Sequence, residues 1–82
     1  MTAGLVLRFQ TRWADGRYLA TLPGLPGWET FGDTPAEAVD SLAYLLELAA
    51  EHLGEPEAVE AVRVLLASWA TERKQRLRLV SA

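Results

Sequence analysis

The strongest constraint on the fold lies between Leu22 and Glu37, where the chain reads LPGLPGWETFGDTPAE. This stretch holds three of the four prolines and three of the six glycines. Proline fixes φ near about −65° and glycine accepts positive φ, so each Leu-Pro-Gly step favours a type II turn. Two consecutive turns cannot continue a helix or a central strand. The chain must therefore change direction here, with regular elements on either side.

Alternating hydrophobic residues predict antiparallel strands around these turns. Residues 4–13 have the period of a strand with one buried face. The residues expected on that face are Leu5, Leu7 and Phe9. Asp15-Gly16 favours a two-residue hairpin because both residues tolerate positive φ, and residues 17–22 then form the returning strand. With a short third strand at residues 28–31, the first third of the chain is predicted to be a three-stranded meander.

Residues 32–37 read GDTPAE, which predicts the start of a helix. Gly32 is expected to let the chain turn sharply out of the third strand. Thr34 can cap the free amides of the first turn, and Pro35 suits the first helical position because it lacks an N–H. Glu37 completes a capping box and favours the positive end of the helix. The helix is therefore expected to begin directly after Thr34.

This first helix is expected to bury one apolar stripe and to end before Gly54, a natural C-terminal stop. The stripe consists of Ala38, Val39, Leu42, Leu45, Leu46, Ala49 and Leu53. Residues 55–74 then predict a second helix, and its core side consists of Val59, Val62, Leu65, Leu66 and Trp69. Whether Glu57 to Arg73 is one helix stays open, because the apolar run at 62–69 is also compatible with a strand.

Residues 75–82 read QRLRLVSA and alternate again, which predicts a closing strand that buries Leu77 and Leu79. An 82-residue chain suits one domain, spanning residues 1–82. The absence of cysteine excludes disulfides and thiolate metal sites. No signal-peptide pattern opens the chain and no apolar run could span a bilayer, so we expect a cytoplasmic protein without a membrane partner.

Charge is segregated along the chain. Nine of the eleven acidic residues lie between Arg17 and Arg63, where no Lys or Arg occurs. Beyond this region the sign reverses in a basic group that consists of Arg73, Lys74, Arg76 and Arg78. The acids are compatible with a solvated helix face, or with an acidic surface that steers a basic partner.

Residues suited to catalysis are sparse. His52 is the sole histidine and no serine or aspartate is obviously placed beside it. Glu47 and Glu51 lie one helical turn apart, but a metal site would need a third ligand. We therefore predict no catalytic, metal or cofactor-binding residues, and a protein that is not an enzyme.

Four residues instead suggest contacts between proteins. Trp13 beside the hairpin and Trp28 after the turns are large aromatic groups of the kind enriched at interfaces. Tyr44 and Leu48 lie one turn apart on the otherwise polar face of the first helix, where they suit either a docking site or cover by the second helix. A meander with one helix leaves a sheet face uncovered, so we expect a homodimer or a dimer of dimers. Cover of that face by the second helix is the competing explanation.

The run GRYLATLPGLPGWETFGDTPAEAVDSLAYLLELAAEHL resembles the HicB family of antitoxins, over about half of the chain. The matching residues are Tyr18, Pro23, Leu25, Pro26, Gly27, Gly32, Asp33, Thr34, Glu37 and Ala38. Gly24 stands where the family usually has Asp, and Trp28 where a smaller residue is common. The second helix also departs from the shortest family members.

The resemblance implies an α+β fold of the partial ribonuclease-H type, with element order βββααβ and the last strand beside the first. It also implies a non-catalytic antitoxin-like protein that neutralises a small basic mRNA-cleaving toxin of the HicA type. Two alternatives stay open. The chain could be a solo oligomeric domain that binds another protein or a small ligand, or it could bind nucleic acid weakly through its basic segment. No DNA-binding domain is expected, since only residues 75–82 follow the second helix.

Overall fold

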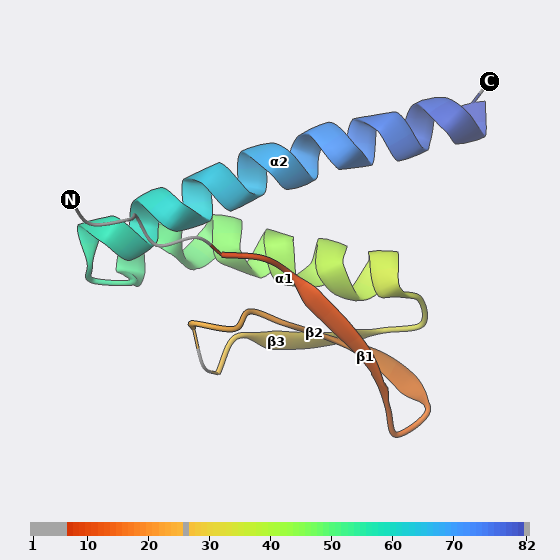
Figure 1. Cartoon of the computed structure of the whole chain (residues 1–82), viewed down its shortest axis with the longest axis horizontal. Helices are drawn as coiled ribbons and strands as arrows, with labels where there is room; N and C mark the ends of the chain where they lie inside the picture. Colours follow the sequence, from red (N-terminus) through yellow and green to blue (C-terminus); the bar gives the residue numbers. More distant parts are fainter. Residues whose placement is uncertain (1–6, 26, 82) are drawn as a thin grey trace.

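A three-stranded sheet, two helices and a short 3-10 turn follow one another along the chain (Figure 1). The computed structural model describes residues 7–25 and 27–81. The elements are β1 (Gln10–Ala14), β2 (Arg17–Thr21), β3 (Glu29–Gly32), α1 (Pro35–Ala49), η1 (Ala50–His52) and α2 (Pro56–Ser81). The strands are antiparallel in the order β1-β2-β3. The predicted α+β class and the meander are therefore confirmed.

The hairpin between β1 and β2 forms at the predicted dipeptide. Ala14 pairs with Arg17, so the loop contains only Asp15 and Gly16. Their φ angles are 52° and 83°. Positive φ at both central residues is the requirement of a type I′ turn, whose twist matches that of the paired strands. The hairpin is therefore set by local chemistry.

Two tight turns connect β2 to β3. The amide of Leu25 donates to the carbonyl of Leu22 at 3.0 Å, and the amide of Trp28 donates to the carbonyl of Leu25 at 3.5 Å. Gly24 and Gly27 have φ angles of 99° and 91°, as type II turns require. Leu5 and Pro26, which also carried sequence predictions, lie outside the described residues.

α1 lies between the sheet and α2 (Figure 1). It contributes Leu42 and Leu46 to the core, both with no exposed surface, and α2 contributes Val62. The other buried core residues are Leu7, Ala20, Leu22, Ala38, Ala61 and Leu65. Leu45, which the sequence places on the core stripe, is 42% exposed. One layer of apolar side chains thus joins the sheet to α1, and a second joins α1 to α2.

The backbone of β3 approaches the first turn of α1 very closely at Gly32. A Cβ atom on this residue would lie 2.5 Å from the amide nitrogen of Ala38. The chain does turn from β3 into α1 directly after Gly32, but Gly32 itself has no positive φ, so the turn is not what requires glycine. The hydroxyl of Thr30 donates to the carbonyl of Ala38 at 2.6 Å, and this hydrogen bond also joins β3 to α1. Glycine is needed here because a side chain would collide with the helix backbone.

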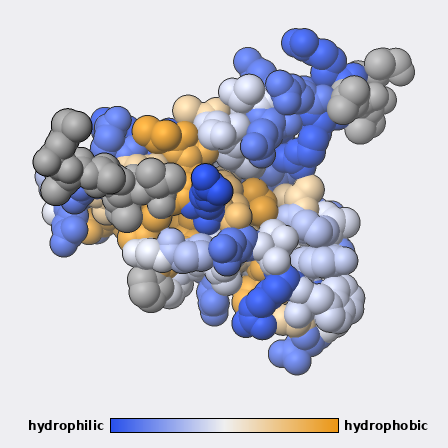
Figure 2. Space-filling view, viewed as in Figure 1, coloured by the Kyte–Doolittle hydropathy of each residue, from blue (hydrophilic) through white to orange (hydrophobic). Residues whose placement is uncertain are grey.

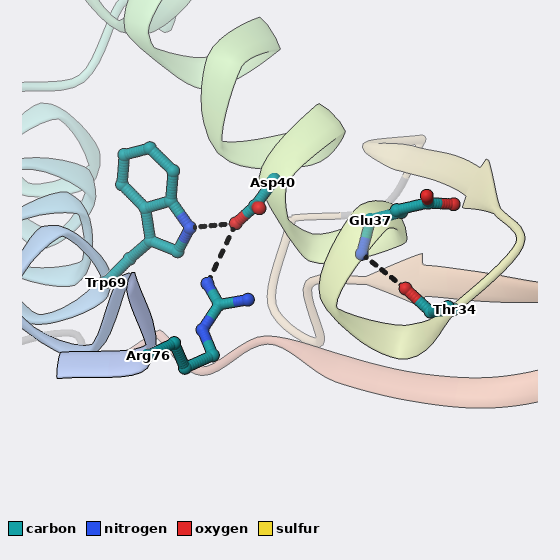
Figure 3. Close-up of polar contacts among 5 residues, drawn as sticks. All are labelled: Thr34, Glu37, Asp40, Trp69 and Arg76. Atoms are coloured by element: carbon teal, nitrogen blue, oxygen red, sulfur yellow. Dashed lines mark hydrogen bonds and ion pairs between the residues drawn. The ribbon is translucent and has the colours of Figure 1, made fainter. Parts of the chain in front are cut away.

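The N-terminus of α1 is capped as predicted (Figure 3). The hydroxyl of Thr34 accepts a hydrogen bond from the amide of Glu37 at 3.1 Å. The carboxylate of Glu37 accepts from the amide of Asp33 at 2.9 Å, one residue before the position that a standard capping box uses. Both side chains therefore satisfy amides that the helix itself cannot.

Thr34→Ala is expected to lower the free energy of unfolding by about 1 kcal/mol, because the amide of Glu37 loses its acceptor. Chemical denaturation monitored by circular dichroism measures this change. Thr34→Ser keeps the hydroxyl and is the matched control. An equal loss of stability in both variants would show that the cap does not contribute.

For the second half of the chain, α2 confirms the predicted second helix and corrects the predicted closing strand. This element is one helix of 26 residues, so Glu57 to Arg73 is continuous and the strand considered at 62–69 is wrong. Residues 75–81 continue the same helix, so the predicted closing strand beside β1 is wrong as well. Gln, Arg and Leu are strong helix formers, and their alternation does not by itself exclude a helix. Leu77 is 55% exposed rather than buried, and the side chain of Leu79 lies outside the described part of the structure.

Candidate protein-binding surface

The outward face of α1 carries three exposed hydrophobic residues. Tyr44, Leu45 and Leu48 are 61%, 42% and 64% exposed. Residues three and four apart on a helix are neighbours, so these side chains form one continuous patch, which we call the α1 stripe. Apolar patches on protein surfaces are the usual places of contact with partners, so the α1 stripe is the candidate binding surface. Tyr44 and Leu48 were predicted as a pair, and α2 does not cover them.

Carboxylates border the α1 stripe. Glu47 and Glu51 are exposed and lie one turn apart on the flank next to Tyr44 and Leu48. Glu37 is exposed one turn before Ser41, on the same side of the helix. Since no Lys or Arg occurs between Arg17 and Arg63, nothing within α1 neutralises these acids. The α1 stripe therefore suits a partner that offers both apolar and basic groups.

The stripe continues toward the edge of the sheet at β3. Among the described residues β3 pairs only with β2, so its outer edge is open. Phe31 is 42% exposed there, with the guanidinium of Arg17 4.3 Å from its ring centre. An open hollow of about 470 Å³ joins this edge to α1 and includes Glu37 and Ser41 in its lining. A partner on the α1 stripe would thus also reach the edge of β3.

The two tryptophans predicted at an interface lie at opposite ends of the sheet. Trp13 pairs with Tyr18 next to the hairpin and is 61% exposed. Its ring meets that of Tyr18 edge to face, with centroids 5.0 Å apart. Trp28 precedes β3 at the far end, is half-buried and packs against the core. The structure therefore brings together Tyr44 and Leu48 but not Trp13 and Trp28.

Asp40 ties α1 to α2 (Figure 3). Its Oδ1 accepts hydrogen bonds from the indole Nε1 of Trp69 at 2.6 Å and from Nη2 of Arg76 at 3.1 Å. The guanidinium of Arg73 lies 5.7 Å from the ring centre of Trp69. The four residues of the basic group, Arg73, Lys74, Arg76 and Arg78, are all exposed on α2. Two of them, Arg73 and Arg76, thus already contact other residues of the chain.

A groove lies on the opposite side of the molecule, between α2 and the segment that enters β1. Figure 2 shows hydrophobic side chains gathered there. The groove has a volume of about 440 Å³ and its lining includes Leu7, Phe9, Val64, Leu65 and Trp69. Its shape and apolar lining are compatible with a small hydrophobic ligand.

His52 and the carboxylates are the remaining groups that the sequence analysis considered for chemistry. In residues 7–25 and 27–81, no three His, Cys, Asp or Glu side chains come close enough together to hold a metal ion. His52 is exposed at the end of η1. No helix in the same part of the chain has the length and apolar character needed to cross a membrane.

Comparison of the chain with models of protein families found no match, and neither curated proteins nor solved structures matched it.

Proposed function

We propose that this chain is a non-catalytic protein-binding module, an antitoxin-like subunit that holds a small basic toxin of the HicA type. The α1 stripe is the observation that carries the proposal. Tyr44 and Leu48 are the two most exposed residues of this stripe, and both lie next to acidic residues of the same helix. The resemblance of residues 16–53 to HicB antitoxins supplies the class of partner.

The chemistry of the α1 stripe fits two roles in binding. Tyr44 and Leu48 would be buried by the partner, and anchors of this kind provide most of the binding energy of protein interfaces. Glu47 and Glu51 would face Lys and Arg side chains of the partner, which accelerates encounter and disfavours acidic competitors. A toxin that binds RNA needs a basic active site, so an acidic partner can mask that site by occupying it.

The double variant Tyr44→Ala/Leu48→Ala is expected to weaken binding of a small basic protein by at least 100-fold, because two buried anchors are lost. The measurement begins with affinity capture on the full chain and continues with titration of the captured protein. Trp13→Ala is the control, since Trp13 is equally exposed but lies at the hairpin. Equal binding by the double variant and the wild type would exclude the α1 stripe.

The antitoxin role needs a second test. The protein encoded by the adjoining reading frame is first expressed alone, and the arrest of cell growth that it causes is measured. The measurement is then repeated with co-expression of the wild type or of the double variant. Relief of arrest by the wild type alone supports the proposal. If the adjoining product is neither basic nor able to cleave mRNA, the antitoxin role is wrong, whatever the capture experiment shows.

The alternative is a solo domain that binds a small ligand, and the groove beside α2 is the observation that favours it. Its wall combines Phe9, Leu65 and Trp69 with Ser68 and Glu72, which is the mixture of apolar and polar groups that small-molecule sites use. Quenching of tryptophan fluorescence by such a ligand, with unchanged capture of proteins, would favour this alternative.

A further inference from the structure

Among residues 7–25 and 27–81, no other helix or strand packs on the face of α2 that points away from α1. The buried residues of α2 are Ala58, Ala61, Val62 and Leu65, all on the inner side. On the opposite side, residues spaced alternately three and four apart form a line that we call the outer stripe. It consists of Glu57, Glu60, Val64, Ala67, Thr71, Lys74 and Arg78, and all seven are exposed. This spacing is that of the seam of a two-stranded coiled coil.

Charge changes sign along the outer stripe. Its N-terminal end is acidic, with Glu57 and Glu60, and its C-terminal end is basic, with Lys74 and Arg78. The central residues, Val64, Ala67 and Thr71, carry no charge and have small side chains. Val64 is the largest hydrophobic residue among them and is 62% exposed. A helix whose two ends carry opposite charge is complementary to an antiparallel copy of itself, whereas a parallel copy would bring like charges together.

The C-terminal half of α2 is largely exposed to solvent. Every residue from Ala70 to Arg78 is exposed, and α2 extends past the end of α1 (Figure 1). The ion pair of Arg76 with Asp40 is partly solvent-accessible, and exposed pairs of this kind stabilise by at most about 1 kcal/mol. Helices in proteins owe most of their stability to packing. A partner on this segment would supply that packing.

We infer that two copies of this chain associate through their outer stripes, with the two α2 helices antiparallel. Glu57 and Glu60 of one copy then lie beside Lys74 and Arg78 of the other, and two-fold symmetry repeats the contact. Ala67 and Thr71 allow close approach of the helices at the centre. The α1 stripes stay exposed in the dimer, so the inference is independent of the proposed function.

Sedimentation equilibrium of the full chain tests the inference. The wild type is expected to approach twice the chain mass of 9.0 kDa at micromolar concentrations, with dissociation favoured by high salt because exposed charges are screened. The variants Glu57→Lys/Glu60→Lys and Lys74→Glu/Arg78→Glu each place like charges in contact. Each is expected to raise the dimer dissociation constant at least tenfold.

Mixing the two charge-reversal variants tests whether the outer stripes themselves form the contact. An equimolar mixture of the two variants is expected to form a heterodimer, because every contact again joins opposite charges. Glu47→Lys/Glu51→Lys changes the net charge by the same amount as Glu57→Lys/Glu60→Lys but acts on α1 and η1, outside the outer stripe, so it should leave the dimer intact. Circular dichroism checks that all variants keep the helical content of the wild type.

Three results would overturn the inference. The first is a wild type that stays at 9.0 kDa at hundreds of micromolar, and the second is a dimer that survives both charge reversals. The second result would point to another surface, such as that of Trp13. The third is a monomeric wild type that binds RNA in a gel-shift assay, together with loss of this binding in the variant Lys74→Glu/Arg78→Glu. The basic end of α2 would then be a nucleic-acid-binding surface. If the chain does not dimerise, the tests of toxin binding by the α1 stripe are unaffected.

Discussion

Gly32→Ala is expected to lower the free energy of unfolding by about 3 kcal/mol, at the upper end of the range for overpacked sites. The added Cβ would lie 2.5 Å from the amide nitrogen of Ala38 and 2.9 Å from both its Cα and the carbonyl carbon of Glu37. All three are backbone atoms of α1, and none can rotate away as a side chain would. The helix must instead move off β3, which strains the hydrogen bond from Thr30 to Ala38.

Gly54→Ala is the control for this prediction. Gly54 has a positive φ of 82° but open space around the position of a Cβ. Its substitution therefore reports only the cost of the left-handed conformation, about 1 to 2 kcal/mol. Urea denaturation of both variants gives the comparison. A smaller loss for Gly32→Ala than for Gly54→Ala would contradict the close approach of β3 to α1.

Leu42→Ala is expected to cost about 3 kcal/mol, because it removes a fully buried side chain and leaves a cavity in the centre of the core. Leu42 lies in the cluster that joins α1 to the sheet and to α2, so neither layer can collapse into the space without moving the other. A small domain has a total stability of only about 5 to 15 kcal/mol. We therefore expect a large fall in the melting temperature.

Leu48→Ala is the matched control, since it makes the same chemical change on the same helix at a site that is 64% exposed. Its effect on stability should stay within about 0.5 kcal/mol. The two variants thus separate folding from binding, because only Leu48 belongs to the α1 stripe. Similar losses of stability in both would mean that Leu48 is buried in the native protein.

Features set by a few neighbouring residues could be predicted from the sequence. Asp15-Gly16 requires positive φ at both positions, and Thr34 caps the helix three residues before Glu37, so each signal is complete within a short window. The order of the strands and the start of α1 follow from these signals. The sequence leaves the exposure of Tyr44 and Leu48 undetermined, because only the placement of α2 decides whether a second helix covers them.

Features that depend on distant residues could not be predicted. Arg and Leu alternate in residues 75–82, which suggests a strand, but the contact of Arg76 with Asp40 belongs to a continuous helix. Gly32 carries no local signal that distinguishes a sharp turn from close packing against Ala38. The outer stripe was also missed, since its face becomes apparent only once residues 75–81 are known to continue α2.

The contact at Asp40 adds a directional constraint to the orientation that the buried residues of α2 already give this helix. Trp69 and Arg76 lie two helical turns apart and donate to the same carboxylate oxygen. Both hydrogen bonds therefore limit rotation of α2 about its own axis. The outer stripe faces away from α1 only in that orientation. Asp40 thus influences a surface that it does not touch, and in Asp40→Ala the direction of the outer stripe would depend on the apolar contacts of α2 alone.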